Sequence, residues 1–246
     1  MMRLVVPGYV HTIFEVAAFF VGFRYYLLLR KNSGDNIPEL NRTWIIVGAA
    51  AGALIGSRVV GAFEDPSWMH NLSLKTIFIA FNSKTIVGGL FGGILGVELV
   101  KKIIGEKQRS GDLFVFPILL ALFIGRIGCF LTALQDHTAG SPTALPWGID
   151  YGDGIYRNPL PLYEILFLAI TFFVLRIIDK RKILASGALF KIMMVVYFLY
   201  RFVNEFGKGD YIYFAHLTAI QIVCCIGLLY YANVFLKPKH LLKANA

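Results

Sequence analysis

Long apolar stretches alternate with short polar connections along almost the whole chain. Each stretch is close to the length of about 20 residues that an α-helix needs to cross a bilayer. We therefore predict about seven transmembrane helices. Their approximate ranges are Ile13–Leu29, Trp44–Phe63, Thr85–Ile104, Leu113–Leu134, Pro161–Ile178, Gly187–Phe206 and Phe214–Leu236. No connection leaves room for a soluble domain, so residues 1–246 are predicted to form a single transmembrane domain.

The composition agrees with this pattern. The 246 residues are 57% hydrophobic and 16% charged, whereas a soluble domain has about 25% charged residues. The chain is therefore predicted to be an all-α integral membrane protein. Its cysteines lie in apolar stretches and do not suggest a disulfide framework, and its histidines lack the spacing of a metal site. Nucleotide-binding and metalloprotease motifs are also missing, so the sequence indicates no cofactor.

The net charge of +9 comes mainly from lysines and arginines in the connections. In a membrane protein this excess is typical of cytoplasmic loops and does not indicate nucleic-acid binding. Most of these basic residues follow the first, third, fifth and seventh predicted helices. The positive-inside rule then predicts a cytoplasmic C-terminus and an outer N-terminus. The two longest connections, Glu64–Lys84 and Gln135–Leu160, would face outward.

Three arginines lie inside predicted helices that run outward from the cytoplasm: Arg58, Arg126 and Arg201. An arginine in an apolar helix costs roughly 2.5–3.5 kcal/mol by insertion scales. At 1.5 Å per residue, all three reach a similar height, about 20 Å above the cytoplasmic end of their helices. This common level indicates either a shared anion site or a network of arginines paired with carboxylates.

Tyr197, Arg201 and Glu205 follow one another at intervals of four residues, so they lie on one helix face. In one interpretation Glu205 only neutralises Arg201. In the other, Arg201 binds a phosphate, Tyr197 donates a hydrogen bond to it, and Glu205 holds the arginine in place. The two interpretations are compatible.

Other candidates cluster at the same outer level. Glu164 is a candidate counter-ion near the arginines, and Tyr163 is a candidate ligand contact or an aromatic anchor at the membrane interface. Gly88 and Gly89 leave room for a lipid headgroup or allow close helix packing. His137 is a candidate base or a solvated loop residue.

Several motifs, in this order, resemble those of the prolipoprotein diacylglyceryl transferase family over nearly the whole chain. They are the glycine–arginine pattern ending in Gly56-Ser57-Arg58, Val87-Gly88-Gly89-Leu90 for HGGL, Gly125–Phe130 for GRxGNF, Asn158–Glu164 for HPxQLYE, and Tyr197, Arg201 and Glu205 for YxxxRxxxE. The resemblance implies transfer of a diacylglyceryl group from phosphatidylglycerol to the lipobox cysteine thiol of a prolipoprotein, with release of glycerol phosphate. It further implies a bacterial inner-membrane location with the active site toward the outer leaflet.

The resemblance also divides the candidate residues by role. The catalytic candidates are Arg126, Arg201, Tyr197, Glu205 and His137. The candidates for binding phosphatidylglycerol are Arg58, Arg126, Gly88, Gly89, Tyr163 and Glu164.

Several positions depart from the family pattern. Val87 replaces its histidine, Cys129 replaces its asparagine, and Glu15 stands where the first helix has a tyrosine. The asparagine and glutamate that should follow the GRxGNF signature read Thr132 and Leu134, or fall in the rearranged Gln135-Asp136-His137. The base is therefore left open among His137, Glu205 and Glu15. A related enzyme with another acceptor, an inactive phospholipid-binding paralogue and a small transporter are the alternative functions.

Overall fold

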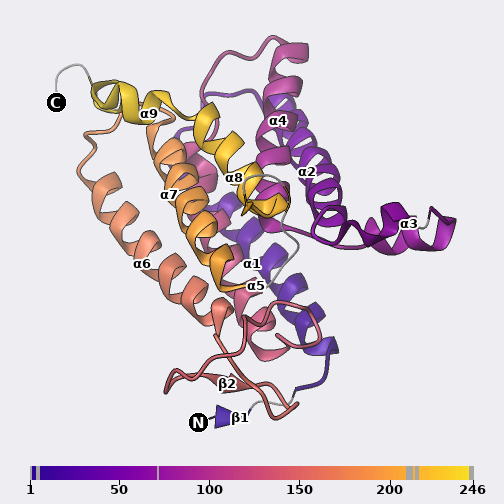
Figure 1. The fold of residues 1–246 in the computed structure, drawn as a ribbon. Helices are drawn as coiled ribbons and strands as arrows, with labels where there is room; N and C mark the ends of the chain where they lie inside the picture. The colour runs from indigo at the N-terminus through magenta and orange to yellow at the C-terminus, as the bar shows by residue number, and fades with distance from the viewer. Residues whose placement is uncertain (1, 4–5, 71, 209–212, 214–215, 244–246) are drawn as a thin grey trace.

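The protein forms a bundle of α-helices, shown as a ribbon in Figure 1. The structure is a computed structural model that describes residues 2–3, 6–70, 72–208, 213 and 216–243. Its helices are α1 (Tyr9–Ser33), α2 (Glu39–Ala62), α3 (Leu74–Ala80), α4 (Ile86–Ile104), α5 (Val115–Leu131), α6 (Leu160–Lys180), α7 (Ala188–Asn204), α8 (Ala219–Tyr230) and α9 (Asn233–Leu236). The prediction of an all-α membrane protein is confirmed at this level.

A helix occurs within each of the seven predicted ranges. Among the described residues, four helices are long and apolar enough to cross a membrane, namely α1, α2, α6 and the segment Asp112–Leu131 that contains α5. α4 carries Glu98, Lys101 and Lys102 in its second half, and α7 and α8 are shorter, with 17 and 12 residues. Seven spans therefore stay a prediction.

The last predicted range differs most from the structure, and residues 214–215 lie outside its described part. α8 begins only after Thr218, whose side chain accepts a hydrogen bond from the backbone N–H of Gln221. The Gln221 side chain accepts one from Thr218 in return. This capping box fixes the start of the helix, because it pairs two N–H groups that would otherwise lack partners. A turn at Tyr231 then separates α8 from α9.

α2 and α4 pack against each other through glycines. The two rows, each spaced by four residues, are Gly48, Gly52 and Gly56 on α2 and Gly88, Gly92 and Gly96 on α4. A Cβ atom added to Gly52 or Gly92 would collide with the backbone of the other helix. The missing side chains thus let the two backbones come into direct contact, as small residues do in membrane helix pairs.

α1 and α5 make a second close pair. A Cβ atom on Gly22 would lie 2.9 Å from Cβ of Ala121, and one on Gly128 would lie 2.8 Å from Cβ of Phe14. The contact at Gly128 brings the first turn of α1, which holds His11, against the last turns of α5.

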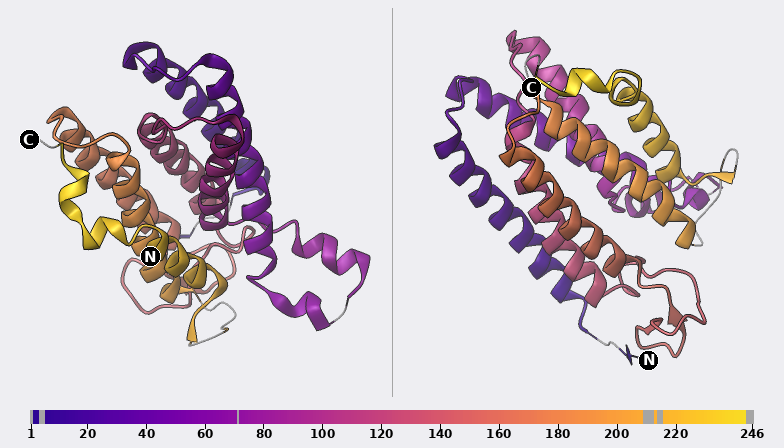
Figure 2. Two further views of the ribbon diagram at one scale, coloured as in Figure 1. Left: turned by 90° about the horizontal axis from the view of Figure 1, so that it is seen from above. Right: turned by 90° about the vertical axis from the view of Figure 1, so that its left-hand side faces the viewer.

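The longer connections form small structures at the ends of these helices. The strands β1 (Met2–Arg3), β2 (Ile149–Asp150) and β3 (Tyr156–Arg157) form one sheet in the order β1-β2-β3, in which β1 is parallel and β3 antiparallel to β2. Near β3, Arg157 donates a hydrogen bond of 2.7 Å to Asp153, which lowers the pKa of that carboxyl. The 3-10 helix Pro66–His70 and α3 project sideways from the bundle (Figures 1 and 2).

Candidate active site

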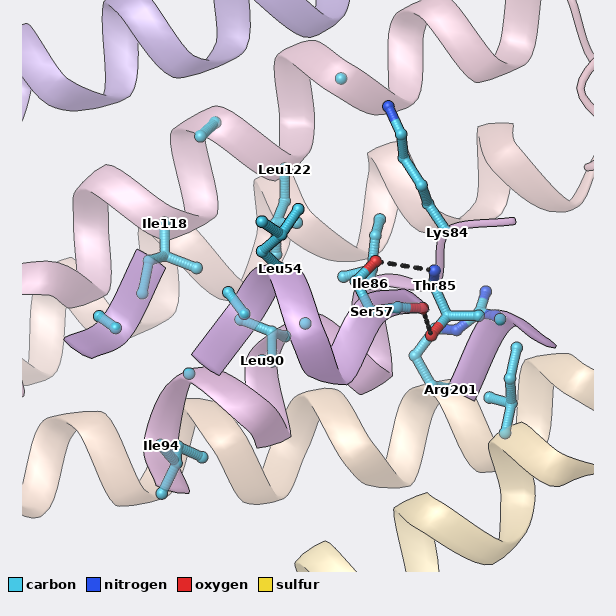
Figure 3. Close-up of a pocket in the computed structure, with 18 of the residues that line it drawn as sticks. Leu54, Ser57, Lys84, Thr85, Ile86, Leu90, Ile94, Ile118, Leu122 and Arg201 are labelled. Atoms are coloured by element: carbon cyan, nitrogen blue, oxygen red, sulfur yellow. Dashed lines mark hydrogen bonds between the residues drawn. The ribbon is translucent and has the colours of Figure 1, made fainter. Parts of the chain in front are cut away.

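A cavity of about 2370 Å³ lies among α1, α2, α4, α5, α6, α7 and α8. Aliphatic side chains gather in one part of it, and Figure 3 labels Leu54, Leu90, Ile94, Ile118 and Leu122 there. Polar side chains gather in another part, where Figure 3 labels Ser57, Lys84, Thr85 and Arg201. The cavity is therefore amphipathic, like a phospholipid.

Glu164, in the second turn of α6, lies at the centre of a buried ion-pair cluster at the cavity wall. Its Oε2 atom lies 2.9 Å from Nε of Arg126 and 3.1 Å from NH1 of Arg201. Its Oε1 atom accepts a hydrogen bond of 2.7 Å from the hydroxyl of Tyr197. Glu164 is only 1% exposed, and a buried carboxylate needs such partners because it has lost its hydration.

The second carboxylate of the cluster is Glu205, just past the end of α7. Its Oε2 atom accepts a hydrogen bond of 2.9 Å from NH2 of Arg201, so the predicted pair four residues apart is confirmed. Lys208 extends the cluster outward, since its Nζ atom lies 3.8 Å from Glu205 and 3.4 Å from Glu64. Both terminal nitrogens of Arg201 are thus occupied by carboxylates.

Arg126 is held differently. Its Nε atom pairs with Glu164, but its terminal nitrogens NH1 and NH2 make no hydrogen bond or ion pair with any residue that the structure describes. The residue is 8% exposed and lines the cavity. A guanidinium group held by its inner nitrogen presents two N–H-rich ends in a fixed fork, which is the geometry that binds a phosphate or carboxylate.

Arg58 lines the same cavity as Arg126 and Arg201. It is not part of the buried cluster, because its NH1 atom donates hydrogen bonds to the carbonyl of Phe81 at 2.8 Å and to Oδ1 of Asn82 at 3.0 Å. The guanidinium group therefore ties the connection after α3 to α2.

Of the remaining residues predicted to bind phosphatidylglycerol, only some line the cavity. Gly89 lines the cavity, whereas Gly88 faces α2, where an added Cβ would lie 2.7 Å from Val60. The hydroxyl of Tyr163 accepts a hydrogen bond of 2.7 Å from Trp147, and Tyr163 is not among the described residues that line the cavity.

Another cluster was not predicted from the sequence. His11, Asp136 and Cys129 meet where the start of α1 packs on the end of α5. Nδ1 of His11 lies 2.8 Å from Oδ2 of Asp136 and 3.9 Å from Sγ of Cys129. His137, by contrast, is exposed at the cavity rim with a positive φ of 53° and makes no contact of this kind within the described chain.

These features define a helical membrane protein with a buried arginine–carboxylate cluster at the wall of an amphipathic cavity. A family model described as prolipoprotein diacylglyceryl transferase matches residues 3–236. The chain therefore belongs to the prolipoprotein diacylglyceryl transferase family, and the resemblance read from its motifs is confirmed.

Curated relatives agree with this assignment. A protein of Finegoldia magna named phosphatidylglycerol–prolipoprotein diacylglyceryl transferase is 28% identical over 88% of this chain and 85% of its own length. A relative of the same name from Nitratidesulfovibrio vulgaris (strain DSM 19637 / Miyazaki F) is 31% identical over 74% of this chain and 69% of its own length. A third relative of the same name, from Solidesulfovibrio magneticus, is 29% identical over 88% of this chain and 83% of its own length.

Proposed function

We propose that this protein transfers the diacylglyceryl group of phosphatidylglycerol to the lipobox cysteine of prolipoproteins, as its relatives are named for doing. The observation that carries the proposal is Arg126, whose two terminal nitrogens have no partner among the described residues and which lines the amphipathic cavity. An anionic phospholipid matches both properties, because it joins a phosphate to two hydrocarbon chains.

The cavity lining suggests how the donor lipid lies. The aliphatic part around Leu54, Leu90 and Leu122 would receive acyl chains, since burying each CH₂ group contributes about 0.8 kcal/mol. The phosphate would then lie at Arg126, with Lys84 and Arg58 as further cations on the same cavity. Gly89 leaves space there, and Gly88 contributes indirectly by allowing α4 to pack on α2.

Arg126 would also act on the reaction itself. The thiol sulfur attacks the glyceryl carbon, the bond from that carbon to the phosphate oxygen breaks, and glycerol phosphate leaves. Negative charge grows on the phosphate as the bond breaks, so a fixed guanidinium group stabilises this step more than the bound lipid. In this proposal Glu164, Tyr197, Arg201 and Glu205 position Arg126 through the hydrogen bonds and ion pairs that connect them.

We propose seven spans with the N-terminus outside, the C-terminus in the cytoplasm and the active site toward the outer leaflet of the bacterial inner membrane. The distribution of basic residues supports this orientation. The positions of β1 and α9 at opposite ends of the bundle are consistent with an odd number of spans (Figure 1).

The experiment that tests the function uses the purified full chain in phosphatidylglycerol vesicles with a synthetic signal peptide that contains a lipobox cysteine. We expect one thioether-linked diacylglyceryl group per modified peptide, detected by mass, and an equal amount of glycerol phosphate. A peptide with serine in place of the cysteine, and vesicles of phosphatidylethanolamine, serve as controls.

Other outcomes of this experiment would favour one of the alternative functions. Glycerol phosphate without modified peptide would indicate a different acceptor. Saturable binding of phosphatidylglycerol without any release would indicate an inactive phospholipid-binding paralogue. In cells depleted of their own diacylglyceryl transferase, the active enzyme should restore lipoprotein maturation.

A further inference from the structure

The histidine that the family carries before its two glycines is absent here. Val87 occupies that position, is 1% exposed and belongs to the hydrophobic core. A transfer to a thiol nevertheless needs a group that accepts the thiol proton, because the thiolate is the nucleophile. The proton acceptor must therefore come from another part of the chain.

Among the histidines in the described part of the chain, His11 lies beside the cavity and is held in a fixed orientation by a carboxylate. Its Nδ1 atom lies 2.8 Å from Oδ2 of Asp136, and both residues line the cavity. The carboxylate of Asp136 is itself fixed, because the hydroxyl of Thr132 donates a hydrogen bond to the same Oδ2 atom. Thr132 and Asp136 lie on the turn that ends α5, so the end of this helix sets the orientation of the imidazole.

The contact with Asp136 determines which nitrogen of His11 carries the hydrogen. A carboxylate only accepts hydrogen bonds, so Nδ1 must be the protonated nitrogen of the neutral ring. Nε2 then holds the lone pair, and it makes no hydrogen bond with any residue that the structure describes. A carboxylate that fixes the tautomer and orientation of an imidazole is the arrangement by which histidine serves as a general base.

The dyad is also close to the proposed phosphate site. Cys129, whose Sγ atom lies 3.9 Å from Nδ1 of His11, follows Arg126 by three residues on α5. Residues three apart lie on the same helix face. All of these side chains line one cavity, so an acceptor thiol and a donor phosphate can meet there.

We infer that His11, oriented by Asp136, is the catalytic base that accepts the proton of the acceptor thiol, an inference that rests on the proposed function. The proton moves from sulfur to Nε2 of His11, and the sulfur forms its bond to the glyceryl carbon. The electron pair of the broken carbon–oxygen bond leaves with glycerol phosphate, which takes up the proton from His11. Asp136 is a positioning residue in this scheme.

The other candidate bases are placed less favourably. Glu205 is buried and ion-paired with Arg201, so accepting a proton would break that pair. Glu15 lies 2.9 Å from Nζ of Lys84 and is engaged in the same way. His137 is exposed and has no carboxylate that orients it among the described residues.

The test compares His11→Ala, Asp136→Asn and the matched control His70→Ala, an exposed histidine outside the cavity lining. We expect His11→Ala to lower kcat by at least about 100-fold, the lower end of the usual contribution of a general base, with KM for phosphatidylglycerol changed less than about threefold. Asp136→Asn should lower kcat roughly 10-fold or more, and Asp136→Glu should recover part of the loss. His70→Ala should leave kcat unchanged.

The pH dependence separates a base from a structural residue. The titratable groups that face His11 are Asp136, Cys129 and Glu15. A free thiol has a pKa of about 8.5, so above that pH the acceptor ionises without help. The defect of His11→Ala should therefore shrink at least tenfold between pH 7 and pH 9.5, which a structural defect would not do.

Two results would overturn the inference while the wild-type enzyme is active. One is full activity of His11→Ala at pH 7. The other is a loss of activity at pH 7 in His137→Ala but not in His11→Ala, which would assign the base to His137. An inactive wild-type enzyme with peptide and phosphatidylglycerol would instead refute the proposed function, so the two failures are distinguishable.

Discussion

Nε of Arg126 lies 2.9 Å from Oε2 of Glu164, so this arginine is anchored by its inner nitrogen while its two terminal nitrogens have no partner in the described part of the chain. Arg201, paired with the same carboxylate, has both terminal nitrogens occupied. Two arginines in one cluster therefore differ in their contacts. Arg201 completes the charge balance, and Arg126 is available to an anion.

Arg126→Ala should abolish transfer while the protein still inserts and folds. The variant removes the proposed phosphate contact but leaves Glu164 paired with Arg201 and Tyr197. Turnover is measured with the lipobox peptide. Binding of phosphatidylglycerol and the Tm of the protein in detergent are measured alongside it. Arg126→Lys should restore only a small part of the activity, because an ammonium group lacks the planar fork. Full activity of Arg126→Ala would contradict the shared phosphate site.

Arg201→Ala should also abolish activity, but by a different route. It leaves Glu205 without its 2.9 Å partner and weakens the hold on Glu164. Removing one partner of a buried ion pair costs about 3–5 kcal/mol. We therefore expect a lower Tm than for Arg126→Ala, measured side by side in the same detergent. Equal Tm values would show that the two arginines contribute equally to stability, contrary to this prediction.

Glu164→Gln tests the centre of the cluster. The amide keeps the size of the side chain and can still accept the hydrogen bond from Tyr197, but it removes the negative charge between two buried guanidinium groups. We expect a strong loss of stability and activity, since two like charges would then face each other in a medium of low dielectric constant. Glu98→Gln is the control, because Glu98 is exposed and its one ion pair within the described residues is a distant one, 3.9 Å from Lys101. A variant as stable as wild type would contradict the role of Glu164.

The contact of α2 with α4 predicts a sharp contrast between two glycines on one helix. Gly92→Ala should destabilise the protein by about 1–3 kcal/mol, the usual penalty for overpacking, because the new Cβ would meet the backbone of Gly52 and Gly56. Gly93→Ala should be nearly neutral, since its Cβ would lie 3.5 Å from the nearest atom. Chemical or thermal unfolding of the two variants in detergent measures the difference. A similar change at both positions would contradict the packing role of Gly92, because the gain in helix propensity from glycine to alanine is the same at both.

Cys129→Ser should retain most of the transfer activity. The thiol is 8% exposed, and the neighbouring Nδ1 of His11 is committed to Asp136, so no base is left for Cys129 itself. The intact mass of the wild-type enzyme after reaction should show no added diacylglyceryl group. A stable adduct on Cys129 would instead indicate a covalent intermediate.

The helices followed from the sequence because apolar stretches of this length have few other stable structures in a membrane. The sequence also predicts that Tyr197, Arg201 and Glu205 share one helix face, because a spacing of four residues places side chains on the same side of a helix. Two features were beyond such reasoning. α8 begins at a capping box inside an apolar range, where hydropathy gives no boundary. Glu164 was predicted as a counter-ion, but which arginines it pairs with depends on how α5 and α7 pack on α6.

The dyad of His11 and Asp136 was even harder to predict from the sequence. The two residues are far apart in the chain, and neither lies in a recognisable motif. Their contact depends on Gly128, which lets α1 approach α5 to the point where an added Cβ would lie 3.4 Å from Cα of His11. A glycine on an apolar helix indicates a close neighbour but does not identify it.

The aliphatic part of the cavity has a further consequence for a transferase of this kind. Water could attack the same glyceryl carbon as the thiol, and phosphatidylglycerol would then be hydrolysed to diacylglycerol and glycerol phosphate without modifying any protein. If acyl chains filled the space between α2, α4 and α5, as proposed, bulk water would have no room to reach the bond from that side. The lipid would thus shield itself from hydrolysis until a signal peptide brings its cysteine.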